Sequence, residues 1–133
     1  MSELAIEAVG LTKAFRGGNV AVKDLDLAVK RGAVYGLVGR NGSGKTSTLR
    51  LLLGLLHADC GSARVLGVDF GDAPRAVRSR VAYVPQSQQI YGWMTLEELC
   101  RCMGKLNERW DKDRARELAG KWELPWKRSA TGW

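Results

Sequence analysis

The chain has 133 residues, which suits one domain with its own core and is too short for two ordinary domains. Its 45% hydrophobic and 26% charged residues are typical of a globular protein and argue against a disordered or fibrous one. No stretch approaches the roughly 20 apolar residues of a membrane-spanning helix, and the first residues lack the basic-then-apolar order of a secretion signal. We therefore expect a cytoplasmic protein.

The net charge of +7 raises the question of nucleic acid binding. The 21 Lys and Arg residues are scattered, however, and the chain has no run of five basic residues. A solvated basic surface is therefore favoured, and a face for polyanions stays open as the alternative. No specific nucleic acid partner is expected.

The first third of the chain predicts strands. Residues 4–9 and 20–29 alternate apolar and polar side chains, which is typical of half-buried strands. Between them, Gly17-Gly18-Asn19 predicts a turn that tolerates positive φ, so the two strands should pair antiparallel. Residues 33–38 then form a nearly continuous apolar run, which is typical of a strand buried on both faces of a parallel sheet.

The middle of the chain predicts an amphipathic helix followed by two strands. The helix has Gly54 as a tolerated weak point, and turn residues over 59–62 end it. Its apolar stripe, at helical spacing, consists of Leu49, Leu52, Leu53 and Leu56. We expect strands over 63–68 and 80–84, separated by a short helix over 74–79 that begins with proline.

The last part of the chain predicts two helices. Thr95 and Glu98 can satisfy each other's free backbone donors in a capping box, which marks the start of the first helix. The second helix begins at about Lys112, and Pro125 closes it. The order along the chain is therefore a β-rich start, an α/β core and a helical segment.

The segment from Gly39 to Thr46 fits the pattern G-x-x-x-x-G-K-[ST] between an apolar strand and an amphipathic helix. Its glycines let backbone N–H groups approach phosphate oxygens, and the helix start adds its positive dipole end. Lys45 supplies a mobile charge for the β- and γ-phosphates, and the Thr46 hydroxyl suits Mg²⁺. The pattern predicts a site for a purine nucleoside triphosphate, with ATP and Mg²⁺ as the expected cofactors. The predicted binding residues here are Gly39, Arg40, Asn41, Gly42, Ser43, Gly44, Lys45, Thr46 and Ser47.

Four features in a fixed order make the chain resemble the nucleotide-binding domain of ATP-binding cassette (ABC) transporters over almost its whole length. Besides the phosphate loop, in which Arg40 stands where Pro is commoner, they are Gly10-Leu-Thr-Lys-Ala-Phe15, Leu52-Leu-Gly-Leu-Leu56 with Gly61-Ser62, and Tyr83-Val-Pro-Gln86. None of the last three is specific alone, whereas the ordered set of four is.

The resemblance implies roles for residues outside the loop. Phe15 would stack on adenine, and Gln86 would contribute an oxygen toward Mg²⁺ and the attacking water. Lys45 and Gln86 are then the expected catalytic residues, and Thr46 and Gln86 the expected metal ligands. A packed or turn aromatic and a solvated loop residue remain the alternative interpretations of Phe15 and Gln86.

The resemblance also implies a fold and partners. The expected fold is an α/β P-loop NTPase core with a partial parallel sheet, an N-terminal antiparallel β subdomain and the start of a helical subdomain. Residues 1–128 would form one domain, with the helical subdomain beginning at about residue 91, and residues 129–133 are a candidate non-native tail. The implied partners are a membrane-spanning transporter subunit and a second nucleotide-binding domain, at the inner face of the membrane. Residues 91–98 are similar to exporter-type members.

Three features of such domains do not follow in this sequence: an LSGGQ-type segment, an apolar strand ending in Asp-Glu (Walker B) and a switch histidine. We therefore interpret the chain as a truncated domain and expect ATP binding without hydrolysis, because hydrolysis in the family needs that carboxylate and an opposing LSGGQ segment. Two alternatives stay open. One is a small P-loop nucleotide kinase, and the other is a non-catalytic, nucleotide-dependent interaction module.

Overall fold

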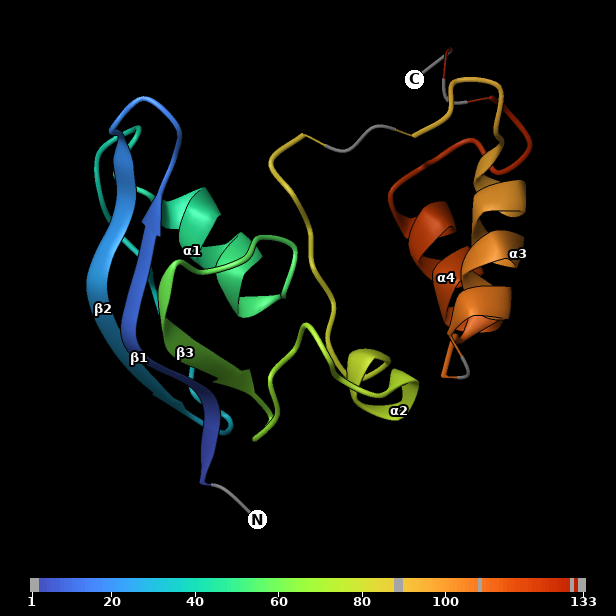
Figure 1. The fold of residues 1–133 in the computed structure, drawn as a ribbon. Coiled ribbons are helices and arrows are strands. Elements are labelled where there is room, and N and C mark those ends of the chain that lie inside the picture. Colours follow the sequence, from blue (N-terminus) through green and yellow to red (C-terminus); the bar gives the residue numbers. More distant parts are fainter. Residues whose placement is uncertain (1–2, 88–89, 108, 130, 132–133) are drawn as a thin grey trace. The chain divides into compact units, whose positions relative to one another are not determined.

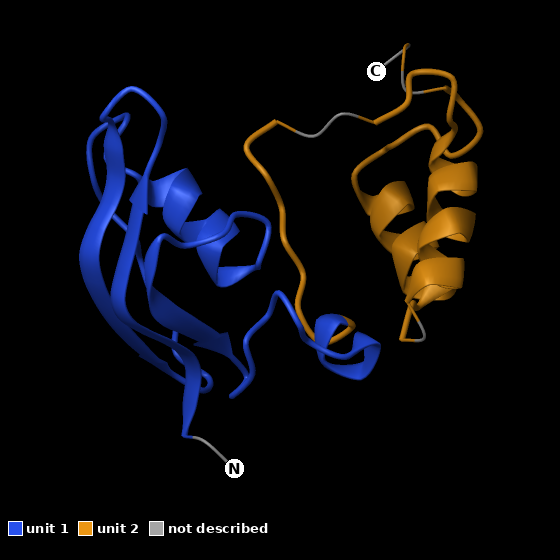
Figure 2. Cartoon of the chain, in the orientation of Figure 1, with its two compact units in different colours: residues 1–78 blue, residues 79–133 orange. Residues whose placement is uncertain are grey.

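A computed structural model describes residues 3–87, 90–107, 109–129 and 131 of the chain (Figure 1). The elements in chain order are strands β1 (Leu4–Ala14) and β2 (Val20–Lys30), helix α1 (Lys45–Leu52), strand β3 (Cys60–Val65), and helices α2 (Arg75–Arg78), α3 (Leu96–Leu106) and α4 (Lys112–Lys121). They belong to two compact units, residues 1–78 and residues 79–133 (Figure 2). The division into subdomains near residue 90 stays a prediction.

The first unit is built on a three-stranded antiparallel sheet in the order β2-β1-β3. The predicted antiparallel pairing of β1 with β2 is confirmed, as is the turn between them. Gly17 and Gly18 have φ of 101° and 82°, and the Phe15 N–H donates to the Asn19 carbonyl at 2.8 Å. The glycines permit this tight turn because they lack a Cβ. Helix α1 lies beside the sheet (Figure 1).

A single carboxylate ties β3 to the end of β1. Asp59 accepts hydrogen bonds from the Lys13 ammonium and the Ala14 N–H, both at 2.7 Å, and its own N–H donates to the Thr12 carbonyl at 2.9 Å. Strand β3 starts directly afterwards, at Cys60, three positions before the predicted start at residue 63. The predicted turn over residues 59–62 was therefore wrong for residues 60–62, which pair with β1, whereas Asp59 forms a bend.

Helix α1 also differs in detail from its prediction. It ends at Leu52, and its buried face consists of Thr48, Leu51 and Leu52, whereas Leu49 is 42% exposed. Gly54 is not a weak point inside a helix. It lies beyond the helix with φ of 62°, and a Cβ there would come within 2.5 Å of the Gly71 backbone. The close passage of another chain segment therefore requires glycine at position 54.

The two segments predicted as buried strands, residues 33–38 and 80–84, are not strands in the structure. Val34 is fully exposed, Val38 is 96% exposed and Val84 is 82% exposed. A strand needs a neighbouring backbone to pair with, and neither segment has one among the residues that the structure describes. The apolar pattern indicates a need for burial but does not supply the neighbour.

The second unit contains α3 and α4, which pack against each other. The predicted capping box is confirmed: the Glu98 N–H donates to the Thr95 hydroxyl at 3.2 Å, and the Thr95 N–H donates to the Glu98 carboxylate at 2.8 Å. The predicted second helix is confirmed as α4, which ends at Lys121. Within the described ranges, no helix has the length and apolar character needed to cross a membrane.

The hydrogen bonds of Asp59 predict how the stability of the fold changes with pH. The hydrogen bond from Lys13, followed by that from the Ala14 N–H, lowers the pKa of Asp59 below its ordinary 3.8. A lowered pKa in the folded state means that the stabilisation is fully present above pH 3.8 and is lost as the pH falls through the folded-state pKa. Asp59→Asn should therefore destabilise the chain at neutral pH, and the difference from wild type should shrink in acid.

Urea unfolding between neutral pH and about pH 3 measures this difference. Asp72→Asn is the matched control, because Asp72 makes no ion pair within the described part of the chain. A constant offset between wild type and Asp59→Asn across the whole pH range would show that the carboxylate charge does not act in this way.

Candidate functional site

The segment from Gly39 to Thr46 folds as an exposed loop that leads into α1. The Ser43 N–H donates to the Arg40 carbonyl at 3.1 Å and closes a turn, and Gly42 within that turn has φ of 80°. A Cβ on Gly39 would lie 2.5 Å from the Ser43 hydroxyl oxygen. The loop therefore folds back so tightly that a side chain at its first position would force the Ser43 side chain to move.

Gly44 fixes where the helix starts. It is the N-cap of α1 with φ of 88°, and a Cβ there would collide with the carbonyl oxygen of Ala21 on β2. Its own carbonyl accepts from the Thr48 N–H at 2.8 Å and from the Thr48 hydroxyl at 3.0 Å. The start of α1 thus packs directly against the backbone of β2 at Gly44, which has no side chain in the way. Gly44 also provides no side-chain cap, so the first-turn N–H groups are left for another acceptor.

Lys45 folds back over the loop. Its ammonium donates to the carbonyls of Gly39 at 2.6 Å and Arg40 at 2.8 Å, and the Ser43 hydroxyl lies 3.4 Å away. These oxygens satisfy the donors of the ammonium while it stays at the mouth of the loop. Because the side chain is long and flexible, it can exchange these neutral acceptors for an anion with which it makes stronger, charge-assisted bonds.

The other predicted site residues are spread over both units. Thr46 is exposed and Ser47 half-buried in the first turn of α1, and Asn41 is exposed in the loop. Phe15 is 42% exposed at the end of β1, beside the turn into β2. Gln86 is exposed and belongs to the second unit, whereas the loop belongs to the first.

Two supporting groups were not predicted from the sequence. The Ala21 carbonyl limits position 44 to glycine, and Thr48 is buried with its hydroxyl on the Gly44 carbonyl. The position of Thr48, four residues after the N-cap, is a local signal, because a threonine one turn into a helix can bond back to the carbonyl of residue i−4. No sequence signal points to Ala21, since its backbone makes the contact.

The contact with Ala21 predicts that Gly44→Ala destabilises the fold. The matched control is Gly32→Ala, because Gly32 has a similar φ of 76° but open space around its Cβ position. The control should cost about 1 kcal/mol for the backbone conformation, and Gly44→Ala should cost about 2 kcal/mol more because backbone must shift. Urea unfolding measures both, and equal losses would contradict the contact.

Comparisons with known proteins agree with this geometry. The family profile described as "ABC transporter" matches residues 22–130. The ABC transporter ATP-binding protein YtrB of Bacillus subtilis (strain 168) is 35% identical over 120 residues, which are 90% of this chain and 40% of YtrB. The daunorubicin/doxorubicin resistance ATP-binding protein DrrA of Streptomyces peucetius is 43% identical over 115 residues, which are 86% of this chain and 34% of DrrA.

A solved structure described as "Structure of ATP binding subunit of ABC transporter" superposes with a TM-score of 0.82 at 24% identity, over 97% of this chain and 55% of that one. This likeness confirms the predicted α/β fold class. The chain spans less than half the length of YtrB and of DrrA. The family profile, these relatives and the fold agree, and the chain belongs to the ABC transporter family, among its ATP-binding proteins.

Proposed function

We propose that this chain binds Mg-ATP on the loop from Gly39 to Thr46, as part of a subunit that powers transport through a membrane-spanning partner. One observation carries the proposal: the loop is already folded around an uncapped helix start, with the Lys45 ammonium held on its carbonyls. Phosphate oxygens are the acceptors that such a helix start and such a lysine suit.

The residues present fit the triphosphate and its metal ion. The Thr46 hydroxyl is exposed in the first turn of α1 and is a hard oxygen ligand of the kind Mg²⁺ prefers. Bound Mg²⁺ would neutralise charge on the phosphates. Gln86 is the second proposed metal ligand, and Lys45 and Gln86 are the residues that we propose for catalysis in a domain that also supplies the Walker B carboxylate and an LSGGQ segment.

Phe15 is the proposed stacking partner of adenine. Its N–H bonds to Asn19 across the turn, and β2, which begins at Val20, touches the helix start through the Ala21 carbonyl. Phe15 therefore lies at the turn next to the strand that abuts the phosphate loop. A half-exposed aromatic is suited to stacking on a purine, because much of its surface is still open.

The partners that we propose are a membrane-spanning subunit and a second nucleotide-binding domain, at the inner face of the membrane. The second unit exposes Tyr91 and Trp93 by 69% and 68%, with their rings stacked at 5.8 Å between centroids. Exposed aromatics of this kind are enriched at protein interfaces. DrrA is named for daunorubicin/doxorubicin resistance. On this basis we propose that the present chain belongs to an exporter-type system.

The proposal predicts binding that depends on Lys45. A fluorescent ATP analogue titrated into the 133-residue chain with Mg²⁺ should bind, and Lys45→Ala should weaken binding by at least about tenfold, as the loss of a charge-assisted hydrogen bond does. Lys127→Ala, which removes an exposed lysine from the second unit, is the charge-matched control and should bind as wild type does. Binding that is absent, or equal in wild type and Lys45→Ala, would refute the proposal.

We further propose that these 133 residues bind ATP without turning it over, because they include neither a Walker B carboxylate nor an LSGGQ segment. Phosphate release from saturating ATP should then remain at the level of a blank without protein. A turnover number of about 1 s⁻¹, which is at the lower end of the range for ordinary enzymes, would contradict this. Phosphoryl transfer to a nucleoside monophosphate would instead support the nucleotide kinase, which the family membership disfavours.

A further inference from the structure

A hollow of about 210 Å³ adjoins the phosphate loop within the first unit. Its lining includes two lysines, Lys23 from β2 and Lys45 from the start of α1, and two hydroxyl-bearing residues, Ser43 and Thr48. The remaining lining residues are apolar: Ala21, Val22, Leu25, Leu37 and Val38. The hollow thus has two cationic residues and no acidic one.

The two lysines differ in how their charges are satisfied. The Lys45 ammonium is held by loop oxygens. The Lys23 ammonium has no hydrogen-bond or ion-pair partner among the described residues. No ion pair joins it to the neighbouring Asp24 either, whose carboxylate lies 3.5 Å from the Cβ position of Gly10.

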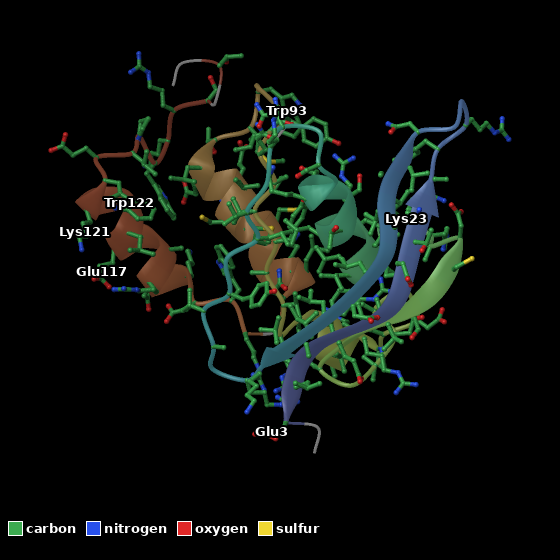
Figure 3. All side chains as sticks on the ribbon, turned by 90° about the vertical axis from the view of Figure 1, so that its left-hand side faces the viewer. Glu3, Lys23, Trp93, Glu117, Lys121 and Trp122 are labelled. Atoms are coloured by element: carbon green, nitrogen blue, oxygen red, sulfur yellow. The ribbon has the colours of Figure 1, made fainter. Side chains whose placement is uncertain are left out.

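Other lysines on the same sheet do have acidic partners. Lys13 on β1 pairs with Asp59 at 2.7 Å, and Lys30 at the far end of β2 lies 3.8 Å from Glu3. Figure 3 labels Lys23 and Glu3 at different ends of the sheet. The lysine without an acidic partner is therefore the one that lines the hollow beside the loop.

Two like charges on one hollow raise its positive potential, and an incoming polyanion relieves their repulsion. An exposed cation at the rim of a site acts mainly by attracting the charged ligand, so its effect falls on the association rate and is screened by salt. Lys23 satisfies these conditions, since it is exposed and borders the hollow that Lys45 also lines.

We propose that Lys23 is a second cation of the nucleotide site, a positioning residue that attracts and orients the phosphate chain before Lys45 leaves the loop carbonyls. This inference rests on the proposed function, because it needs a nucleotide at the loop. It adds a residue that belongs to none of the four sequence features of the family resemblance.

The test is stopped-flow association of fluorescent ATP and AMP analogues with the 133-residue chain at low and high salt. Lys23→Gln should slow association of the ATP analogue by about three-fold at low salt, the size of an exposed ion pair, and by less at high salt. The AMP analogue, with one phosphate, should be affected less. Lys23→Arg should restore the rate, because it restores the charge.

Lys30→Gln is the matched control, since it removes the same charge from the same strand at the end next to Glu3. It should leave the association rate close to wild type. Equal effects of Lys23→Gln and Lys30→Gln would overturn the inference, and so would an equal loss for the ATP and AMP analogues, which indicates a structural role. Failure of the proposed function itself is distinguishable, because wild type would then not bind or Lys45→Ala would have no effect.

Discussion

The contact between Gly44 and the Ala21 carbonyl sets the arrangement of the first unit. Because a side chain at position 44 would collide with backbone, α1 can start only where a glycine meets β2. This contact sets the phosphate loop against the sheet and leaves the helix start without a side-chain cap. The same strand leads back to the turn that carries Phe15. One backbone contact therefore relates the proposed phosphate and adenine sites.

Hydrogen bonds within the loop hold its shape. The turn from Arg40 to Ser43 is closed by a backbone hydrogen bond, and Lys45 adds two bonds to carbonyls of the same loop. A preformed loop reduces the ordering cost of binding. The lysine that stabilises the loop is also the one proposed to bind phosphate, so binding exchanges one set of acceptors for another rather than creating a new arrangement.

Local sequence signals predicted local structure well. The Gly17–Gly18 turn, the Thr95–Glu98 capping box and the phosphate loop each depend on residues close together in the sequence, and all three form. The apolar run over residues 33–38 was predicted as a buried strand and is exposed instead, because strand formation depends on a neighbour that no local pattern specifies. Gly54 was misinterpreted for the same reason, since its requirement comes from the distant Gly71 backbone.

The candidate site likewise combines residues that a local pattern indicates with contacts that only the folded chain provides. Residues 39–47 were assigned to the site from one short pattern that contains the glycines, the lysine and the helix start, and their binding of nucleotide stays a prediction. The supporting contacts of Ala21 and Thr48 appear only when β2 and α1 are placed against each other. Gln86 was assigned from the family resemblance and lies in the other unit, so no pattern local to the loop could have pointed to it.

The most direct measurement of triphosphate binding on a preformed loop is amide hydrogen exchange over residues 39–48, with and without a non-hydrolysable ATP analogue and Mg²⁺. We expect the Ser43 amide to exchange slowly even without nucleotide, because it donates to the Arg40 carbonyl. The uncapped amides at the start of α1 should become slow only when nucleotide is added. A loop that exchanges freely without nucleotide, or first-turn amides that nucleotide leaves unchanged, would contradict these expectations.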